Sequence, residues 1–243
     1  MQKDFKVAMK IAYYGVAFFG FQRQNEVLSV SDFLSEKFRS VGIFGEFLAS
    51  GRTDRGVHAS AQVISVDIPE FHRDFDRLKQ LLNTKLYPRI KIKQIWQVES
   101  GFHARFSVKR RGYCYVLSQK YSPFWVLFSH FYPLKNPLLV QESLNAFRGV
   151  YDFGAFMKNG GSGCESSVRE IFHAKLVKRG DFYLISFWGN GFLRSQIRLM
   201  VGFLLEIDKG NLGIEDLKRQ LLGEKIFSVP APSNGLFLSR VDY

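Results

Sequence analysis

Apolar and polar residues follow two different spacings along this chain. In residues 90–98 they alternate almost without interruption, which is typical of a strand with one buried face. In residues 29–41 and 74–87 apolar side chains recur every three or four positions, which is typical of an amphipathic helix. Because both spacings occur within the first half of the chain, we expect mixed α/β structure.

The first half of the chain predicts strands and helices in the ferredoxin-like order β-α-β-β-α-β. Ser29, with Asp32 three residues later, has the chemistry of a capping box, and Asp74 can cap the second helix. The expected elements are strands at about residues 5–14, 46–49, 62–67 and 90–98, and helices at about residues 29–41 and 74–87.

The second half repeats this order, with one additional short helix. The expected elements are strands at about residues 112–119, 167–178, 182–190 and 236–241, and helices at about residues 137–148, 192–208 and 214–222. We therefore predict an α/β (α+β) fold with two ferredoxin-like halves, residues 1–103 and 104–243. Their largely antiparallel sheets are expected to flank a central cleft, which is a common place for a binding site.

The charge of the chain adds a class of partner to this picture. The 243 residues include 34 Lys and Arg against 22 Asp and Glu, a formal net charge of +12. Residues 1–120 contain 20 basic and 11 acidic side chains, whereas residues 121–243 contain 14 and 11. Such an excess favours a polyanionic partner, either nucleic acid or an anionic membrane. We expect the first half to attract anions more strongly.

Membrane, metal and cofactor classes fit the sequence poorly. The longest apolar runs fall far short of the ~20 residues that span a bilayer, and residues 1–7 lack a signal-peptide region. Two cysteines, Cys114 and Cys164, and five scattered histidines have neither metal-binding nor disulfide spacing. The chain contains no glycine-rich phosphate loop and no nucleophile elbow. We expect a cytoplasmic protein with reduced thiols, no metal and no cofactor.

The segment Gly51-Arg-Thr-Asp-Arg-Gly-Val-His-Ala59 places one acid, Asp54, among Arg52, Arg55 and His58. Neighbouring cations favour the charged form of a carboxylate. A charged acid on a loop beside a strand can be a working group. The same charges can also pair among themselves in a surface turn. The spacing alone leaves both interpretations open.

Residues 102–115 interleave basic and aromatic side chains, among them Arg105, Arg110, Arg111 and Tyr113. Cations neutralise phosphates and rings stack on bases, so this composition suits a single-stranded nucleic acid. A solvated run of charges beside a strand would have the same composition, and it is the simpler interpretation of this segment taken alone.

Two smaller groups of polar side chains are further candidates. Arg194 and Arg198 are four residues apart, so we expect them to share one face at the start of the helix at residues 192–208. There they need a partner such as a carboxylate, unless both are exposed. Gln22 and Arg23 follow the first strand and can contact bases or phosphates. Alternatively, phenylalanines simply pack that loop.

Together these segments resemble the tRNA pseudouridine synthase A (TruA) family. The resemblance is strongest in Gly51–Ala59, and other motifs follow in the family's order over nearly the whole chain. They are Tyr13-Tyr-Gly15, Phe19-Gly-Phe-Gln22, Phe102-His-Ala-Arg-Phe-Ser107, Tyr113-Cys-Tyr115, Asp152-Phe153, Gly191-Phe-Leu-Arg194 with Arg198, and Ala231-Pro-Ser-Asn-Gly-Leu236. Several motifs in one order are more specific than any one of them.

The resemblance implies an isomerase, an intramolecular transferase that converts uridine to pseudouridine at positions 38 to 40 of the tRNA anticodon stem-loop. It implies a homodimer without cofactor or metal, whose partners are tRNA and a second copy rather than DNA or a membrane. Asp54 would attack the flipped nucleotide, Tyr113 would stack on the base as a candidate for removing the C5 proton, and Arg198 would pair with Asp54. RNA contacts in the cleft are expected from Gln22, Arg23, Arg52, Arg55, His58, Arg105, Arg110, Arg111, Tyr113 and Arg194.

The chain departs from the family pattern at a few positions but keeps the acid, the ring and the arginine. The departures are Arg55 for the usual alanine, Ser31 for a glutamine, Gly112 for a basic residue before Tyr113, and Ser195-Gln-Ile for His-Met-Val before Arg198. Two other functions fit the same charge: an RNA-binding or chaperone module without catalysis, and a basic protein–protein scaffold.

Overall fold

The computed structural model describes residues 4–158 and 166–243. Residues 1–3 and 159–165, and with them Cys164, lie outside the described residues. The chain divides into two compact units, Met1–Lys109 with Leu238–Tyr243, and Arg110–Phe237. The expected domain boundary between residues 103 and 104 stays a prediction, because compactness alone does not show which part folds independently.

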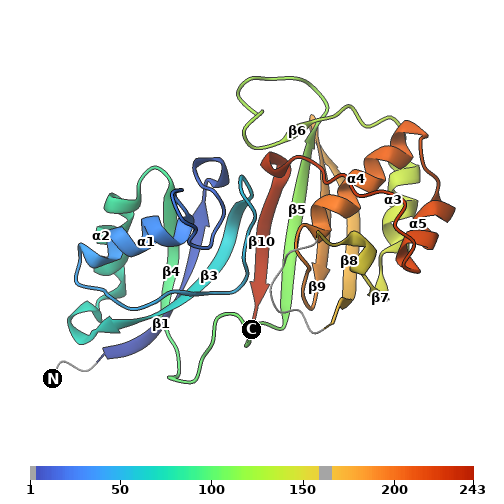
Figure 1. Ribbon diagram of the computed structural model, residues 1–243. Helices are drawn as coiled ribbons and strands as arrows, with labels where there is room; N and C mark the ends of the chain where they lie inside the picture. Colours follow the sequence, from blue (N-terminus) through green and yellow to red (C-terminus); the bar gives the residue numbers. More distant parts are fainter. Residues whose placement is uncertain (1–3, 159–165) are drawn as a thin grey trace. The chain divides into compact units, whose positions relative to one another are not determined.

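The first unit has the expected element order and is built on a sheet in which β1 lies between β3 and β4 (Figure 1). The short β2 pairs with β3. The elements of this unit are β1 (Asp4–Tyr13), α1 (Val30–Arg39), β2 (Leu48–Ala49), β3 (His58–Pro69), α2 (Phe75–Leu86) and β4 (Ile90–Gln97). These strand pairs are antiparallel. The mixed α/β class and the β-α-β-β-α-β order of this half are therefore confirmed.

The helix caps predicted from the sequence are present in the first unit. The Ser29 hydroxyl accepts from the Asp32 backbone N–H at 3.0 Å, and the Asp32 carboxylate accepts from the Ser29 N–H at 3.4 Å. The Asp74 carboxylate accepts from the Arg77 N–H at 3.0 Å. These bonds satisfy donors that the first turn of a helix otherwise leaves open, so both helices begin where the sequence indicates.

The second unit is built on the antiparallel sheet β5-β9-β8-β7, with the short β6 beside β5 (Figure 1). Its helix α3 contacts β8, α4 and α5. The elements are β5 (Arg110–Ser118), β6 (His130–Phe131), α3 (Pro137–Ala146), β7 (Gly149–Asp152), β8 (Val168–Arg179), β9 (Phe182–Gly189), α4 (Gln196–Lys209) and α5 (Ile214–Leu221), followed by β10 (Leu236–Asp242), which ends in the first unit.

Four short 3-10 helices complete the described secondary structure: η1 (Gly15–Ala17), η2 (Glu70–His72), η3 (Gly154–Phe156) and η4 (Ser233–Gly235). The strands β6 and β7 were not predicted, because two and four residues are too few to show an alternation. Among the helices of the described residues, none combines the length and the hydropathy that crossing a membrane requires.

Two predicted boundaries near the candidate site are wrong. Strand β3 begins at His58 rather than at Gln62, so the end of the segment Gly51–Ala59 is strand and not loop. Helix α4 begins at Gln196 rather than at residue 192, because Ser195 has a left-handed backbone with φ of 59° that cannot continue a helix. Arg194 therefore precedes the helix and does not share its face with Arg198.

Candidate active site

Asp54 begins a tight turn that is closed by a hydrogen bond from the Val57 N–H to the Asp54 carbonyl at 3.1 Å. Gly56 is the third residue of this turn and has φ of +78°. A turn with positive φ at its third position requires glycine there, so the sequence Asp-Arg-Gly-Val specifies the turn locally. The turn leaves Asp54 half-buried at its start and Arg55 exposed at its tip.

Thr53, the residue before the acid, is held by the loop that follows β1. Its carbonyl accepts from the Phe21 N–H at 3.1 Å, and its hydroxyl shares a hydrogen bond with the Tyr13 hydroxyl at 2.8 Å. Gly20 has φ of +96°, and a Cβ there would lie 3.0 Å from the Thr53 carbonyl oxygen. The close approach of the two loops therefore depends on a glycine.

The start of the segment Gly51–Ala59 is fixed from strand β3. The buried Gln62 amide donates to the Gly51 carbonyl at 2.7 Å, and the Ser50 N–H donates to the Val63 carbonyl at 2.8 Å. A buried amide without partners would cost about 1–3 kcal/mol, so these bonds hold both the amide and the loop. Backbone contacts thus position Asp54 on both sides, and none of these contacts uses its carboxylate.

His58 is buried, with 1% of its surface exposed. Its Nδ1 accepts a hydrogen bond from the Gly15 N–H at 3.1 Å, so this nitrogen carries no proton of its own. A Cβ on Gly15 would lie 2.1 Å from the Val57 carbonyl oxygen, closer than any side chain permits. The hydrogen bond between Gly15 and His58 joins the loop that follows β1 to the start of β3. The RNA contact that the sequence suggested for His58 stays a prediction.

The other candidate RNA-binding residues of the first unit are exposed: Gln22, Arg23, Arg52, Arg55 and Arg105. Arg23 pairs with Asp32 at 3.2 Å, but its side chain is 81% exposed, and such surface pairs contribute little to stability. The Arg105 guanidinium lies over the Phe106 ring at 5.5 Å from its centroid. Gln22, Arg23, Arg52 and Arg55 lie on two adjoining loops around Asp54.

Tyr113 lies on β5 opposite Phe187 of β9, and only 8% of its surface is exposed. The edge of one ring meets the face of the other where Tyr113 contacts Phe192, with centroids 5.3 Å apart. Such an arrangement is favourable between aromatic quadrupoles and limits how the Tyr113 ring can turn. Burial of the neighbouring Cys114 raises the pKa of its thiol to about 11, so this cysteine stays protonated and unreactive at neutral pH.

Arg198 is held by the segment that precedes β10. Its Nε donates to the Ala231 carbonyl at 2.7 Å, and the Ala231 N–H donates to the Arg198 carbonyl at 2.8 Å. The Tyr115 hydroxyl donates to the Pro232 carbonyl at 2.8 Å, and Gly235 packs against the Tyr115 ring. Burial raises the pKa of the Tyr115 phenol. The nearby positive charge of Arg198 acts in the opposite direction on this pKa and is the smaller effect.

The remaining basic candidates of the second unit lie at strand and helix ends. Arg110 is exposed and is the first residue of β5, and the Arg111 guanidinium donates to the Asn190 carbonyl at 3.2 Å. Arg194 is exposed, and its carbonyl accepts from the Lys158 N–H at 3.2 Å. The predicted site residues therefore fall into two groups, one with Asp54 in the first unit and one with Tyr113 and Arg198 in the second.

Several residues that build these two groups were not singled out as site residues from the sequence. They are Tyr13, Gly15, Gly20, Thr53, Gln62, Tyr115 and Ala231. Most of them fall inside motifs that resemble the family, and that resemblance was the only available signal. The composition of the chain and the spacing of its residues do not show which distant residues a glycine or a buried amide contacts.

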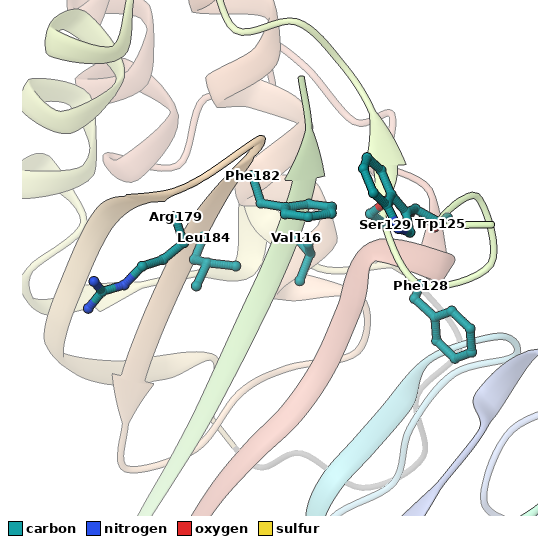
Figure 2. Close-up of a pocket in the computed structure, with 7 residues that line it drawn as sticks. All are labelled: Val116, Trp125, Phe128, Ser129, Arg179, Phe182 and Leu184. Carbon is teal, nitrogen blue, oxygen red and sulfur yellow. Dashed lines mark hydrogen bonds between the residues drawn. The ribbon is translucent and has the colours of Figure 1, made fainter. Parts of the chain in front are cut away.

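A separate apolar pocket of about 360 Å³ lies in the second unit (Figure 2). Strand residues form one wall, and the loop between β5 and β6 supplies Trp125, Phe128 and Ser129. The other lining residues are Val116, Arg179, Phe182 and Leu184. None of the seven is a predicted site residue. Within residues 4–158 and 166–243, no three His, Cys, Asp or Glu side chains gather as metal ligands.

Comparison with known proteins identifies the family. A sequence model described as tRNA pseudouridine synthase matches residues 9–107 and 144–243. The tRNA pseudouridine synthase A of Campylobacter jejuni strain RM1221 is 39% identical over 240 residues, which cover 98% of this chain and 100% of the relative. The proteins of the same name from Wolinella succinogenes and Helicobacter hepaticus are 36% and 37% identical; the matches cover 96% of this chain in each case, and 92% and 97% of the relatives. This chain therefore belongs to the tRNA pseudouridine synthase family, whose members are isomerases.

Proposed function

We propose that this protein converts uridine to pseudouridine in the anticodon stem-loop of tRNA, at positions 38 to 40, with Asp54 as the nucleophile. The observation that carries the proposal is the turn at Asp54–Val57. It offers a half-buried carboxylate on a backbone held on both sides, in a chain of this family. Preorganisation of this kind is what an attacking group needs.

The reaction requires an acid that attacks the nucleotide and a group that removes the proton from C5 of the base. A base inside a stem must first be extruded, which costs a few kcal/mol. The ionised Asp54 then attacks the nucleotide, the bond between N1 and C1′ breaks, and the base turns and rejoins through C5. The proton on C5 is lost, and N1 gains one. No group is released and no oxidant is needed, so the family's lack of a cofactor is consistent with the reaction.

The roles of Tyr113 and Arg198 rest on the family resemblance. Tyr113 stacks on the target base in this proposal and is the candidate for removing the C5 proton. Its support is a ring whose edge-to-face contact with Phe192 limits how it can turn. Arg198 keeps Asp54 ionised in the proposal, because a nearby guanidinium favours the carboxylate form. Its support is a side chain whose Nε is already anchored on Ala231.

The decisive variant is Asp54→Asn, assayed on unmodified tRNA by the release of tritium from C5-labelled uridine. Loss of a covalent nucleophile should lower turnover by about 10³-fold or more, while RNA binding persists. Asp67→Asn is the matched control, because it removes an exposed carboxylate from β3 of the same unit. Wild-type turnover by Asp54→Asn would refute the assignment. RNA binding without any pseudouridine from the wild type would favour the non-catalytic RNA-binding module, which the +12 charge also suits.

The target positions need a separate test. Replacing the uridines at positions 38, 39 and 40 by cytidine, one at a time, should remove the product at the replaced position only. Product that persists after all three replacements would place the activity elsewhere in the tRNA.

Oligomeric state and location complete the proposal. The homodimer follows from the family resemblance and the cytoplasmic location from the two cysteines without disulfide spacing, and each has a direct measurement. Sedimentation equilibrium should return twice the 28.0 kDa mass of the chain, and cell fractionation should recover the protein with the cytoplasm. A single-chain mass over the whole concentration range, or recovery in another fraction, would overturn the corresponding part.

A further inference from the structure

Arg55 occupies a distinctive position beside the proposed nucleophile. It is the exposed second residue of the turn that Asp54 begins, and its guanidinium carbon lies 4.1 Å from the centroid of the Phe19 ring. The corresponding distances of Lys37 and Arg89 to the Phe33 ring are longer, at 5.2 and 5.5 Å. The side chain is therefore directed by an aromatic surface even though it stands in solvent.

The Phe19 ring is itself on a firmly held backbone. The Phe19 N–H donates to the Leu28 carbonyl at 3.0 Å, and its carbonyl accepts from the Gln24 side-chain amide at 2.6 Å. The next residue, Gly20, packs against the Asp54 turn. The ring and the arginine consequently come from two loops that are fixed against each other within the first unit.

The guanidinium of Arg55 forms no ion pair with a carboxylate of the described residues, in contrast to Arg23, which pairs with Asp32. The ring of Phe19 accepts no conventional hydrogen bond, so the N–H donors of the guanidinium above it stay available to another group. Those in-plane donors match the two oxygens of a phosphate.

We propose that Arg55, held on Phe19, binds a backbone phosphate of the RNA next to the nucleotide that Asp54 attacks. The inference rests on the proposed function, since it names one contact of that substrate. A phosphate suits the site better than a base, because the contact uses a full unpaired charge and in-plane donors. A base stacked on the open face of the guanidinium would not need the charge to be unpaired.

The test is the salt dependence of binding to an unmodified anticodon stem-loop RNA, with wild type, Arg55→Ala and Arg77→Ala. Each phosphate contact adds about 0.7–0.9 to the slope of log K against log salt concentration. Arg55→Ala should bind about 5–10-fold more weakly at low salt and lose about one unit of slope. Arg77→Ala removes an exposed arginine of α2 in the same unit and should change neither quantity.

Two further variants separate charge from geometry. Arg55→Lys should keep most of the slope but lose part of the affinity, because an ammonium cannot bind a phosphate through two parallel donors. Phe19→Leu should weaken binding while the charge remains. An unchanged slope in Arg55→Ala would overturn the proposal, and weaker binding by the same factor at every salt concentration would assign the contact to a base.

The outcome is independent of catalysis. Arg55 is exposed, so equal unfolding midpoints in urea for wild type and Arg55→Ala will show that the fold is kept. If the wild type binds the RNA but forms no pseudouridine, the proposed function fails. The difference in salt slope between wild type and Arg55→Ala then still shows whether Arg55 binds a phosphate. If the wild type forms pseudouridine and Arg55→Ala keeps the wild-type slope, only the contact fails.

Discussion

The turn that carries Asp54 and the helix start that carries Arg198 are held in place by different means. Around Asp54 the contacts are backbone hydrogen bonds and close approaches at glycines, and the carboxylate takes no part in them. Around Arg198 the guanidinium is part of the framework, since its Nε donates to the Ala231 carbonyl. These contacts of the first region depend on shape, whereas the contact between Arg198 and Ala231 depends on a charged side chain.

This difference decides which variants can be interpreted. Replacing the Asp54 carboxylate leaves the hydrogen bonds of Phe21, Val57 and Gln62 around its turn intact, so a loss of activity at an unchanged unfolding midpoint reports on chemistry. Replacing Arg198 removes a charge-assisted bond, which contributes about 1.5–3 kcal/mol, so activity and stability change together. The acid is therefore the residue with which to test the reaction, and the glycines are the residues with which to test the framework.

The largest effect on the framework is expected from Gly15→Ala. A Cβ at this position would overlap the Val57 carbonyl oxygen at 2.1 Å, so β3 or the loop must move. We expect a loss of about 3 kcal/mol in the free energy of unfolding, measured by urea denaturation. Gly101→Ala is the control, because nothing lies within 4 Å of its Cβ, and it should stay within about 0.5 kcal/mol of wild type. Equal midpoints for the two variants would show that the first region does not depend on shape.

In the second unit, the variant Tyr113→Phe tests whether the phenol of this residue takes part in the reaction. The ring and its contact with Phe192 remain, but the hydroxyl is lost. If the phenol removes the C5 proton, turnover should fall about 100-fold with little change in RNA affinity. Tyr121→Phe removes the hydroxyl of an exposed tyrosine in the same unit and should leave turnover unchanged. Unaltered kinetics in Tyr113→Phe would limit this ring to stacking.

A smaller effect is expected from Glu26→Gly in the loop that follows β1. Glu26 has φ of 65°, a left-handed conformation that disfavours any residue with a Cβ. Glycine should raise the free energy of unfolding by about 0.5–1 kcal/mol. Glu26→Ala keeps the Cβ and should show no such gain. A gain in both variants would assign the effect to the lost charge rather than to the backbone.

Much of the fold follows from local patterns, and the errors have identifiable causes. The caps at Ser29 and Asp74 and the element order of the first unit were predicted because they depend on residues a few positions apart. The start of α4 was missed because the apolar Phe192 and Leu193 extend the helical spacing, while Ser195 reverses the backbone. The spacing of apolar residues indicates which positions are buried. It does not indicate the backbone angle φ that ends or begins a helix.

The candidate site could be predicted less completely. The motifs around Asp54, Tyr113 and Arg198 are visible in the sequence, and the comparisons show the family to which they belong. The burial of His58 was not visible, nor was the hydrogen bond that its ring accepts from Gly15. The residues next to His58 in the sequence do not show that its ring accepts a hydrogen bond from a glycine far from it along the chain.

The sequence by itself determined the helix caps, the Asp54–Val57 turn, the basic charge and the family motifs, because each depends on nearby residues or on composition. Tertiary structure decided what holds the acid. The β1–β3 pairing has an irregularity between Ile11 and Tyr13, and there Tyr13 comes opposite Ala59 and its hydroxyl reaches Thr53. Such contacts join residues about forty positions apart, and they form only when the register of two strands is set.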